Sequence, residues 1–151
     1  MVLCCHDETT DRLVQAEMAD VKFIEAMPES AEDISSQYSL VVDCIFGFSF
    51  QPPVRPQFSP ILELLSQLSS VPLVSVDIPS GWGVEAGPPE DGATPRLRPA
   101  MLVSLTAPKL CAAHHTGHHY LGGRFVPRQL ADKYQLDLPT YPGTDLVVKL
   151  N

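Results

Sequence analysis

The chain has 151 residues, of which 44% are hydrophobic and 19% are charged, and its formal net charge is −8. This length suits a single domain with a buried core, and the composition is that of a soluble globular protein. The acidic balance argues against nucleic acid as a partner, because phosphates favour a basic surface. No apolar run approaches the roughly 18 residues of a membrane span, and no targeting signal is recognisable, so we expect a cytoplasmic protein.

The first part of the chain alternates apolar runs with helix signals. A helix is expected where a capping residue such as Ser or Thr precedes a run with one apolar face. On this basis the sequence predicts strands at 2–5, 21–24 and 40–46, and helices at 10–19 and 29–38.

The second part continues the alternation. A loop with three prolines covers 47–58, and the strongest helical periodicity in the chain follows Ser59-Pro60. Residues 83–99 are rich in Gly and Pro and are expected to form a surface loop. Further strands are predicted at 73–78, 101–107, 122–127 and 146–148, a helix at 128–136, and a loop in the His-rich connection between 110 and 121. Strands that alternate with helices predict a mostly parallel sheet with helices on both faces.

Three predicted strands end near polar residues. Asp43, Asp77 and Lys109 lie at or just beyond the ends of their apolar runs. Open α/β sheets place their ligands at the carboxyl ends of the strands. The two aspartates could bind a cation together, hydrogen-bond a ribose hydroxyl or act as a general base, or each could cap the turn after its strand. Lys109 could contact a phosphate, or it could be an exposed strand-end lysine.

Other candidate motifs are weaker. The four cysteines form no CxxC pair, and we expect Cys5, Cys44 and Cys111 to be small buried hydrophobic residues in a reducing compartment. The HHxGHH run at 114–119 has no separated partner ligands, so a solvated loop is expected rather than a zinc site. No GxSxG, GxGxxG or GxxxxGK[ST] motif is present.

Four segments, in order, resemble the YjeF N-terminal domain family, which includes the NAD(P)HX epimerase, also called the apolipoprotein A-I-binding protein. They are VVDCIFGFSF at 41–50, VDIPSGW at 76–82, LTAPK at 105–109 and YLGGRFVP at 120–127. The similarity runs from about Leu40 to the C-terminus. It implies a Rossmann-like three-layer α/β/α sandwich with a mostly parallel sheet, usually dimeric.

The resemblance also implies roles for individual residues. Asp43 and Ser80 match potassium ligands, and Asp77 matches a substrate contact, for which we expect a catalytic acid/base role. Lys109 is a further candidate for binding the substrate, NADHX or NADPHX. The substrate-cradling loop matches residues 47–53, with Gly47, Phe48, Ser49 and Phe50 as its candidate contacts.

The chain departs from the family pattern in several places. The family has a first strand followed by an Asn-Asn-Gly-Gly-Asp loop that cradles phosphate, and the sequence contains no such stretch. We therefore expect residues 1–151 to be a single, N-terminally incomplete domain of marginal stability, an isoform or a fragment. Gln51-Pro52 replaces the family's Lys-Gly. In a 3-2-1-4-5 sheet, strand 1 lies between the strands at 2–5 and 40–46, which must otherwise pair directly or leave two buried edges.

These departures favour a binding protein with a degenerate epimerase site. The resemblance implies apolipoprotein A-I as its partner, hence regulation of cholesterol efflux to high-density lipoprotein and of angiogenic signalling. It also implies a homodimer and a secreted form. The alternative is an NAD(P)HX epimerase that interconverts the R and S forms of hydrated NADH and NADPH.

Overall fold

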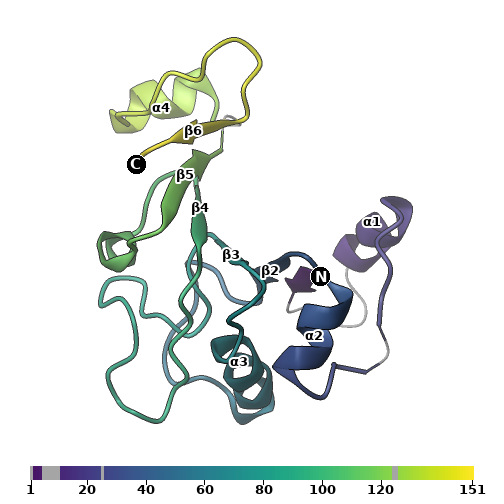
Figure 1. The fold of residues 1–151 in the computed structure, drawn as a ribbon. Coiled ribbons are helices and arrows are strands. Elements are labelled where there is room, and N and C mark those ends of the chain that lie inside the picture. The colour runs from purple at the N-terminus through teal and green to yellow at the C-terminus, as the bar shows by residue number, and fades with distance from the viewer. Residues whose placement is uncertain (1, 5–10, 25, 124–125) are drawn as a thin grey trace.

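The computed structural model describes residues 2–4, 11–24, 26–123 and 126–151. The described residues form a six-stranded sheet whose strands lie side by side in chain order (Figure 1). The first five strands pair in parallel and the sixth is antiparallel, which confirms the predicted α/β class. The strands are β1 (Val2–Cys4), β2 (Val41–Cys44), β3 (Leu73–Val76), β4 (Met101–Leu105), β5 (His118–Gly122) and β6 (Val147–Lys149).

Four α-helices connect or follow the strands, and short 3-10 turns lie at Pro56–Phe58 and Leu110–His114. The second helix begins where the Ser30 side chain accepts a hydrogen bond from the Asp33 N–H at 3.1 Å, as its sequence predicts. Pro60 lies in the first turn of the third helix, where its missing N–H costs nothing. The helices are α1 (Asp11–Met18), α2 (Ala31–Gln37), α3 (Ser59–Ser66) and α4 (Arg128–Tyr134).

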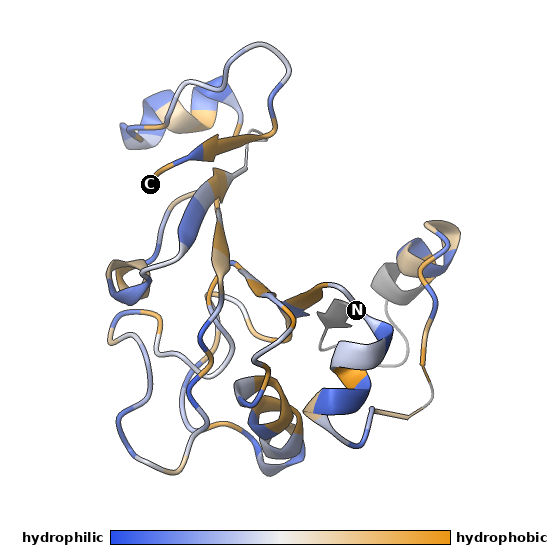
Figure 2. Cartoon of the chain, viewed as in Figure 1, coloured by the Kyte–Doolittle hydropathy of each residue, from blue (hydrophilic) through white to orange (hydrophobic). Residues whose placement is uncertain are grey.

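The main core lies between one face of β2 and β3 and the helices α2 and α3. Ile34 of α2 and Leu62 of α3 are fully buried there against Val41 and Leu73 of the two strands. Burying each such side chain stabilises the fold by roughly 1.5–3 kcal/mol. Figure 2 shows the same distribution, with hydrophobic colouring concentrated on the central strands and α3. On the opposite face Val42 and Val74 are only half-buried.

The first two strands pair directly. Val2 lies opposite Val42 and Leu3 opposite Asp43, in parallel register. Of the two arrangements expected for a chain without a strand between these segments, direct pairing is therefore the one observed. It leaves no unpaired strand edge between β1 and β2.

Two predicted strands were wrong. Residues 21–24 form no strand, and their side chains are exposed. Val21, Phe23 and Ile24 have high β-propensity, but a strand also needs a neighbouring strand edge, and no strand of the described sheet pairs with this segment. Of the strand predicted at 122–127, Gly122 is the last residue of β5, which begins at His118 because pairing with β4 sets its position. Gly123, Val126 and Pro127 lie in no strand, and residues 124–125 lie outside the described part of the chain. The edge strand predicted at 146–148 is confirmed as β6. None of the helices in the described part of the chain is long and apolar enough to cross a membrane.

Candidate active site

The carboxyl ends of β2, β3 and β4 open onto a cavity of about 1140 Å³. Because the strands are parallel, the segments that follow them meet at one edge of the sheet, as the strand-end pattern predicts. The lining residues are 44–51, Pro53, Arg55, Val76, Asp77 and 105–109. All six candidate substrate contacts predicted from the sequence lie in this wall.

Asp77 is held in position from three sides. Its backbone is left-handed, with φ at 72°, and its N–H donates to the Val103 carbonyl at 2.8 Å. Its Oδ2 accepts the Phe48 N–H at 2.7 Å, and its Oδ1 accepts a hydrogen bond from Lys109 Nζ. The carboxylate thus joins the loops that follow β2, β3 and β4. Of the alternatives raised by the sequence, capping of its own turn is not what this side chain does.

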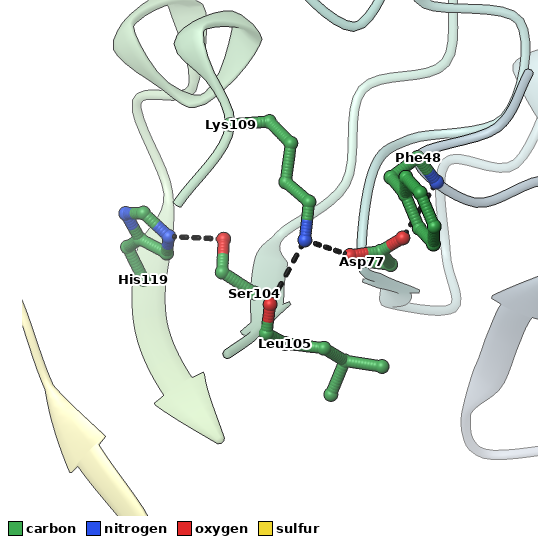
Figure 3. A network of polar contacts seen from close by, with 6 residues as sticks. All are labelled: Phe48, Asp77, Ser104, Leu105, Lys109 and His119. Carbon is green, nitrogen blue, oxygen red and sulfur yellow. Dashed lines mark hydrogen bonds and ion pairs between the residues drawn. The ribbon is translucent and has the colours of Figure 1, made fainter. Parts of the chain in front are cut away.

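Lys109 makes two contacts at the cavity wall. Its Nζ donates to the Asp77 carboxylate and, at 2.8 Å, to the Leu105 carbonyl, so that the ammonium bridges the two strand ends (Figure 3). It also lies 5.9 Å from the centre of the Phe48 ring. Only 18% of the lysine side chain is exposed. The expectation of a freely exposed strand-end lysine is therefore wrong.

Gly47 allows the loop after β2 to approach Asp77. A Cβ at position 47 would stand 3.0 Å from Asp77 Oδ2, closer than carbon and oxygen normally approach. The absence of a side chain here lets the neighbouring Phe48 N–H reach the carboxylate. The glycine is thus part of the geometry of the site.

Thr106, just after β4, has the same left-handed backbone conformation as Asp77, just after β3. Its φ is 67°, and its N–H donates to the Gly122 carbonyl at 2.8 Å. A left-handed conformation is rare for a β-branched residue. This strained turn directs the following segment back so that Lys109 reaches Leu105. Sequence reasoning missed Thr106, although the Thr-Ala-Pro turn after an apolar run was a usable signal.

Aromatic rings form part of the same wall. The rings of Phe46 and Phe50 stack with centroids 4.6 Å apart, and Phe58 packs edge-on against Phe46 at 5.1 Å. Phe48 remains 70% exposed although it lines the cavity. An exposed ring beside a buried ion pair offers a stacking surface for a planar ligand.

Asp43 lies behind this wall and is fully buried. Its Oδ1 accepts hydrogen bonds from the Ser80 hydroxyl at 2.6 Å and the Ile45 N–H at 3.3 Å. Its Oδ2 accepts the Ser75 hydroxyl and the Ser80 N–H, both at 2.9 Å. Burial raises the pKa of this carboxyl, and the hydrogen bonds from Ser80 and Ser75 oppose that rise.

These hydrogen bonds use the oxygen acceptor positions that the expected potassium ion would need. A carboxylate offers about four acceptor positions, and four donors already occupy those of Asp43. The Ser80 hydroxyl donates to Asp43 and accepts the Phe46 N–H at 3.0 Å. A hard cation needs several free oxygen ligands. The arrangement of Asp43 and Ser80 therefore does not fit a bound potassium ion; it ties β2, β3 and the turn after Asp77 together.

A second buried polar pair lies between β4 and β5. Ser104 Oγ and His119 Nε2 are 2.9 Å apart, and both residues are buried (Figure 3). His115 is buried beside them, with its ring 6.2 Å from that of His119. Burial lowers the pKa of His119, and the charge of His115 lowers it further. The expected solvated loop is thus wrong for these two histidines, because β5 begins within the run.

The cysteines follow the expectation in part. Cys111 is fully buried, and burial raises the pKa of its thiol, which makes it a poor nucleophile. Cys44 is only half-buried and lines the cavity, as does Arg55; neither was predicted as a cavity residue. Cys5 lies outside the described residues.

Comparison with known proteins places the chain. A family model described as "YjeF-related protein N-terminus" matches residues 4–111. A protein of Anopheles darlingi named NAD(P)H-hydrate epimerase is 51% identical over 138 residues, which cover 91% of this chain and 58% of that protein. An Aedes aegypti protein of the same name is 55% identical over 121 residues, which cover 80% of this chain and 50% of that protein.

The crystal structure of the yeast protein ynu0 has the same fold. It superposes with a TM-score of 0.80 at 36% identity, covering 99% of this chain and 64% of the yeast chain. This confirms the Rossmann-like architecture expected from the resemblance. The chain matches 58% and 50% of the length of the two curated relatives, so it spans about half of each.

The comparisons correct the expected function. We expected a regulator of cholesterol efflux that binds apolipoprotein A-I and has a degenerate site. That expectation is wrong, because the relatives at 51% and 55% identity are named as epimerases and nothing in the findings points to lipid transport. Asp77, Lys109 and the loop that begins at Gly47 form one cavity wall. This chain belongs to the YjeF-related N-terminal family.

Proposed function

We propose that this chain is an NAD(P)H-hydrate epimerase in which the Asp77–Lys109 pair moves the proton that the reaction requires. The contact between Lys109 Nζ and Asp77 Oδ1, in the wall of a large cavity, is the observation that carries the proposal. The names of the two mosquito relatives supply the substrate class.

The chemistry calls for a proton donor that can also act as an acceptor. Water that adds to an enamine places a hydroxyl on the ring carbon bonded to nitrogen. Inversion at that carbon follows if a proton is given to the hydroxyl, the C–O bond breaks and water leaves with the bonding electrons. The nitrogen lone pair stabilises the planar cation. Water then adds to the opposite face and returns its proton, so that the site ends unchanged.

The described residues fit each step of this reaction. The Asp77–Lys109 pair holds an exchangeable proton, and the Phe48 N–H fixes the carboxylate orientation. The exposed Phe48 ring offers the nicotinamide a stacking surface, and Arg55 adds a cation to the same wall for the phosphates of the dinucleotide. Fixed geometry of this kind supplies much of the rate enhancement that an epimerase needs.

The test uses Asp77→Asn. The protein is incubated with mixed epimers of hydrated NADPH and a dehydratase that accepts the S epimer alone. Wild-type protein should speed consumption of the R epimer, whereas the variant should lose about 10²- to 10⁴-fold of that acceleration, the usual contribution of a general acid or base. Glu63→Gln, an exposed carboxylate on α3, is the matched control and should retain the wild-type rate. No acceleration by wild-type protein, or equal rates for both proteins, would refute the proposal.

A further inference from the structure

A second cavity, of about 670 Å³, lies at the opposite edge of the sheet. It is formed where α3 ends and where β3 and β4 begin, whereas the candidate active site lies beyond the ends of these strands. The two cavities share no residue. The lining residues are 65–73, Arg96, Arg98 and Ala100.

An anchored extended segment presents two arginines to this cavity. Leu97 and Pro99 are buried, while Arg96, Arg98 and Ala100, which alternate with them, are exposed and line the cavity. The Leu97 carbonyl accepts the Trp82 indole N–H at 3.2 Å, and the Ala100 N–H donates to the Leu73 carbonyl at 2.8 Å. The backbone that carries both arginines is therefore fixed before any ligand arrives.

In the described part of the chain, neither guanidinium group is paired with an acidic side chain. Neither Arg96 nor Arg98 makes a hydrogen bond or ion pair with the residues that the structure describes, and no acidic residue is among those lining the cavity. The exposed residues Gln67, Ser69 and Ser70 also line the cavity and add an amide and two hydroxyl groups.

From this arrangement we infer a second ligand site, one that binds the phosphate group of a small molecule or free phosphate. Two guanidinium forks with adjacent hydroxyl donors match the several acceptor oxygens of a tetrahedral dianion better than the two of a carboxylate. The site lies apart from Asp77 and does not depend on the proposed epimerase activity. Because the same strands begin at this site and end at the other, an anion bound here contacts the segment that carries Asp77.

The experiment titrates the ¹⁵N-labelled chain with inorganic phosphate and follows its amide resonances. Shifts are expected at Ser69, Ser70 and Leu73. In the double variant Arg96→Gln/Arg98→Gln the apparent Kd should rise about tenfold or more, since each charged hydrogen bond lost has an effect of this size. Arg128→Gln, which removes an exposed arginine from α4, is the control and should bind as the wild type does.

Additional ligands identify the source of the anion, and a second double variant controls for misfolding. Adenosine 5′-monophosphate that binds more tightly than phosphate, with adenosine inactive, indicates a nucleotide; equal binding indicates free phosphate. Arg96→Lys/Arg98→Lys keeps the charge and removes the fork, so it should bind with intermediate affinity. Shifts confined to Gly47, Phe48 and Lys109, or an unchanged Kd in the double glutamine variant, would overturn the inference. So would equal weakening by Arg128→Gln, which would show a general charge effect.

Discussion

The backbone of Gly47 lies against the carboxylate of Asp77, so that a Cβ at position 47 would stand 3.0 Å from Asp77 Oδ2. Gly47→Ala should therefore displace the carboxylate and lengthen its hydrogen bond to the Phe48 N–H. We expect turnover of hydrated NADPH to fall by up to about 10-fold, less than the roughly 100-fold loss that a 1 Å displacement can cause, because the carboxylate must shift by only a few tenths of an ångström. Kinetic assays together with circular dichroism test this. A variant that folds normally and turns over at the wild-type rate would show that the close approach has no catalytic consequence.

Lys109→Met should leave Asp77 Oδ1 without its ammonium partner. We expect the epimerase rate to fall about 100-fold, within the range for loss of a proton-transfer group. Added ammonium ion should restore part of the rate, because methionine leaves vacant only the position of the lysine nitrogen, which a cation of that size can occupy. Rescue that is equally large for the wild-type protein, or a variant with full activity, would contradict the assignment.

His119 makes stability depend on pH. Burial lowers its pKa below the ordinary value of 6.5, so below that pH the unfolded chain binds a proton that the folded chain does not. Stability should therefore be lost as the pH falls from 6.5 through the lowered pKa. Denaturant unfolding measured over this range should show the loss, and His119→Gln should reduce it. His118→Gln is the matched control, since His118 is exposed on the same strand and should leave the pH dependence unchanged.

Asp43→Asn should destabilise the fold. The asparagine amide group would face hydroxyl and N–H donors from Ser75 and Ser80 with donors of its own. A buried polar group left unsatisfied costs about 1–3 kcal/mol, and we expect the free energy of unfolding to fall by that amount. Urea denaturation measures it. An unchanged midpoint would show that the serine contacts contribute nothing net.

Potassium should not stabilise this chain specifically. Because four donors saturate the Asp43 carboxylate, replacing sodium by potassium at equal ionic strength should leave the Tm unchanged. Differential scanning fluorimetry compares the two salts, with lithium as a third. A Tm that rises with potassium alone would show that the ion displaces these donors and binds.

The sequence predicts the centre of the site because one pattern decides it. An apolar run that ends in Asp77 and a Pro-Ser-Gly turn can only be a strand end, and parallel strands bring such ends together. Lys109 follows from the same reasoning, since it lies just after a neighbouring strand, whereas Gly47 was predicted from the motif resemblance. The motif resemblance predicts the family correctly, but the missing loop and Gln51-Pro52 led to the wrong choice between binding protein and enzyme.

What the sequence does not predict depends on contacts between distant segments. Ser75 as a partner of Asp43 requires the register between β2 and β3, and the burial of His119 requires the pairing of β5 with β4. Residues 21–24 have strand propensity but no neighbouring edge. Local sequence carries no information about such pairings.

The left-handed backbone at Asp77 and Thr106 opposes the stability of the fold to the geometry that catalysis needs. Conformations of this kind cost a non-glycine residue about 1–3 kcal/mol each, and glycine would adopt them freely. Selection for heat resistance alone should thus favour glycine at position 106, because the Thr106 side chain is not part of the ion pair in the cavity. Such selection would not preserve catalysis. Protein engineers who replace these left-handed residues to raise the melting temperature will need to select for turnover in parallel, because both positions line the cavity.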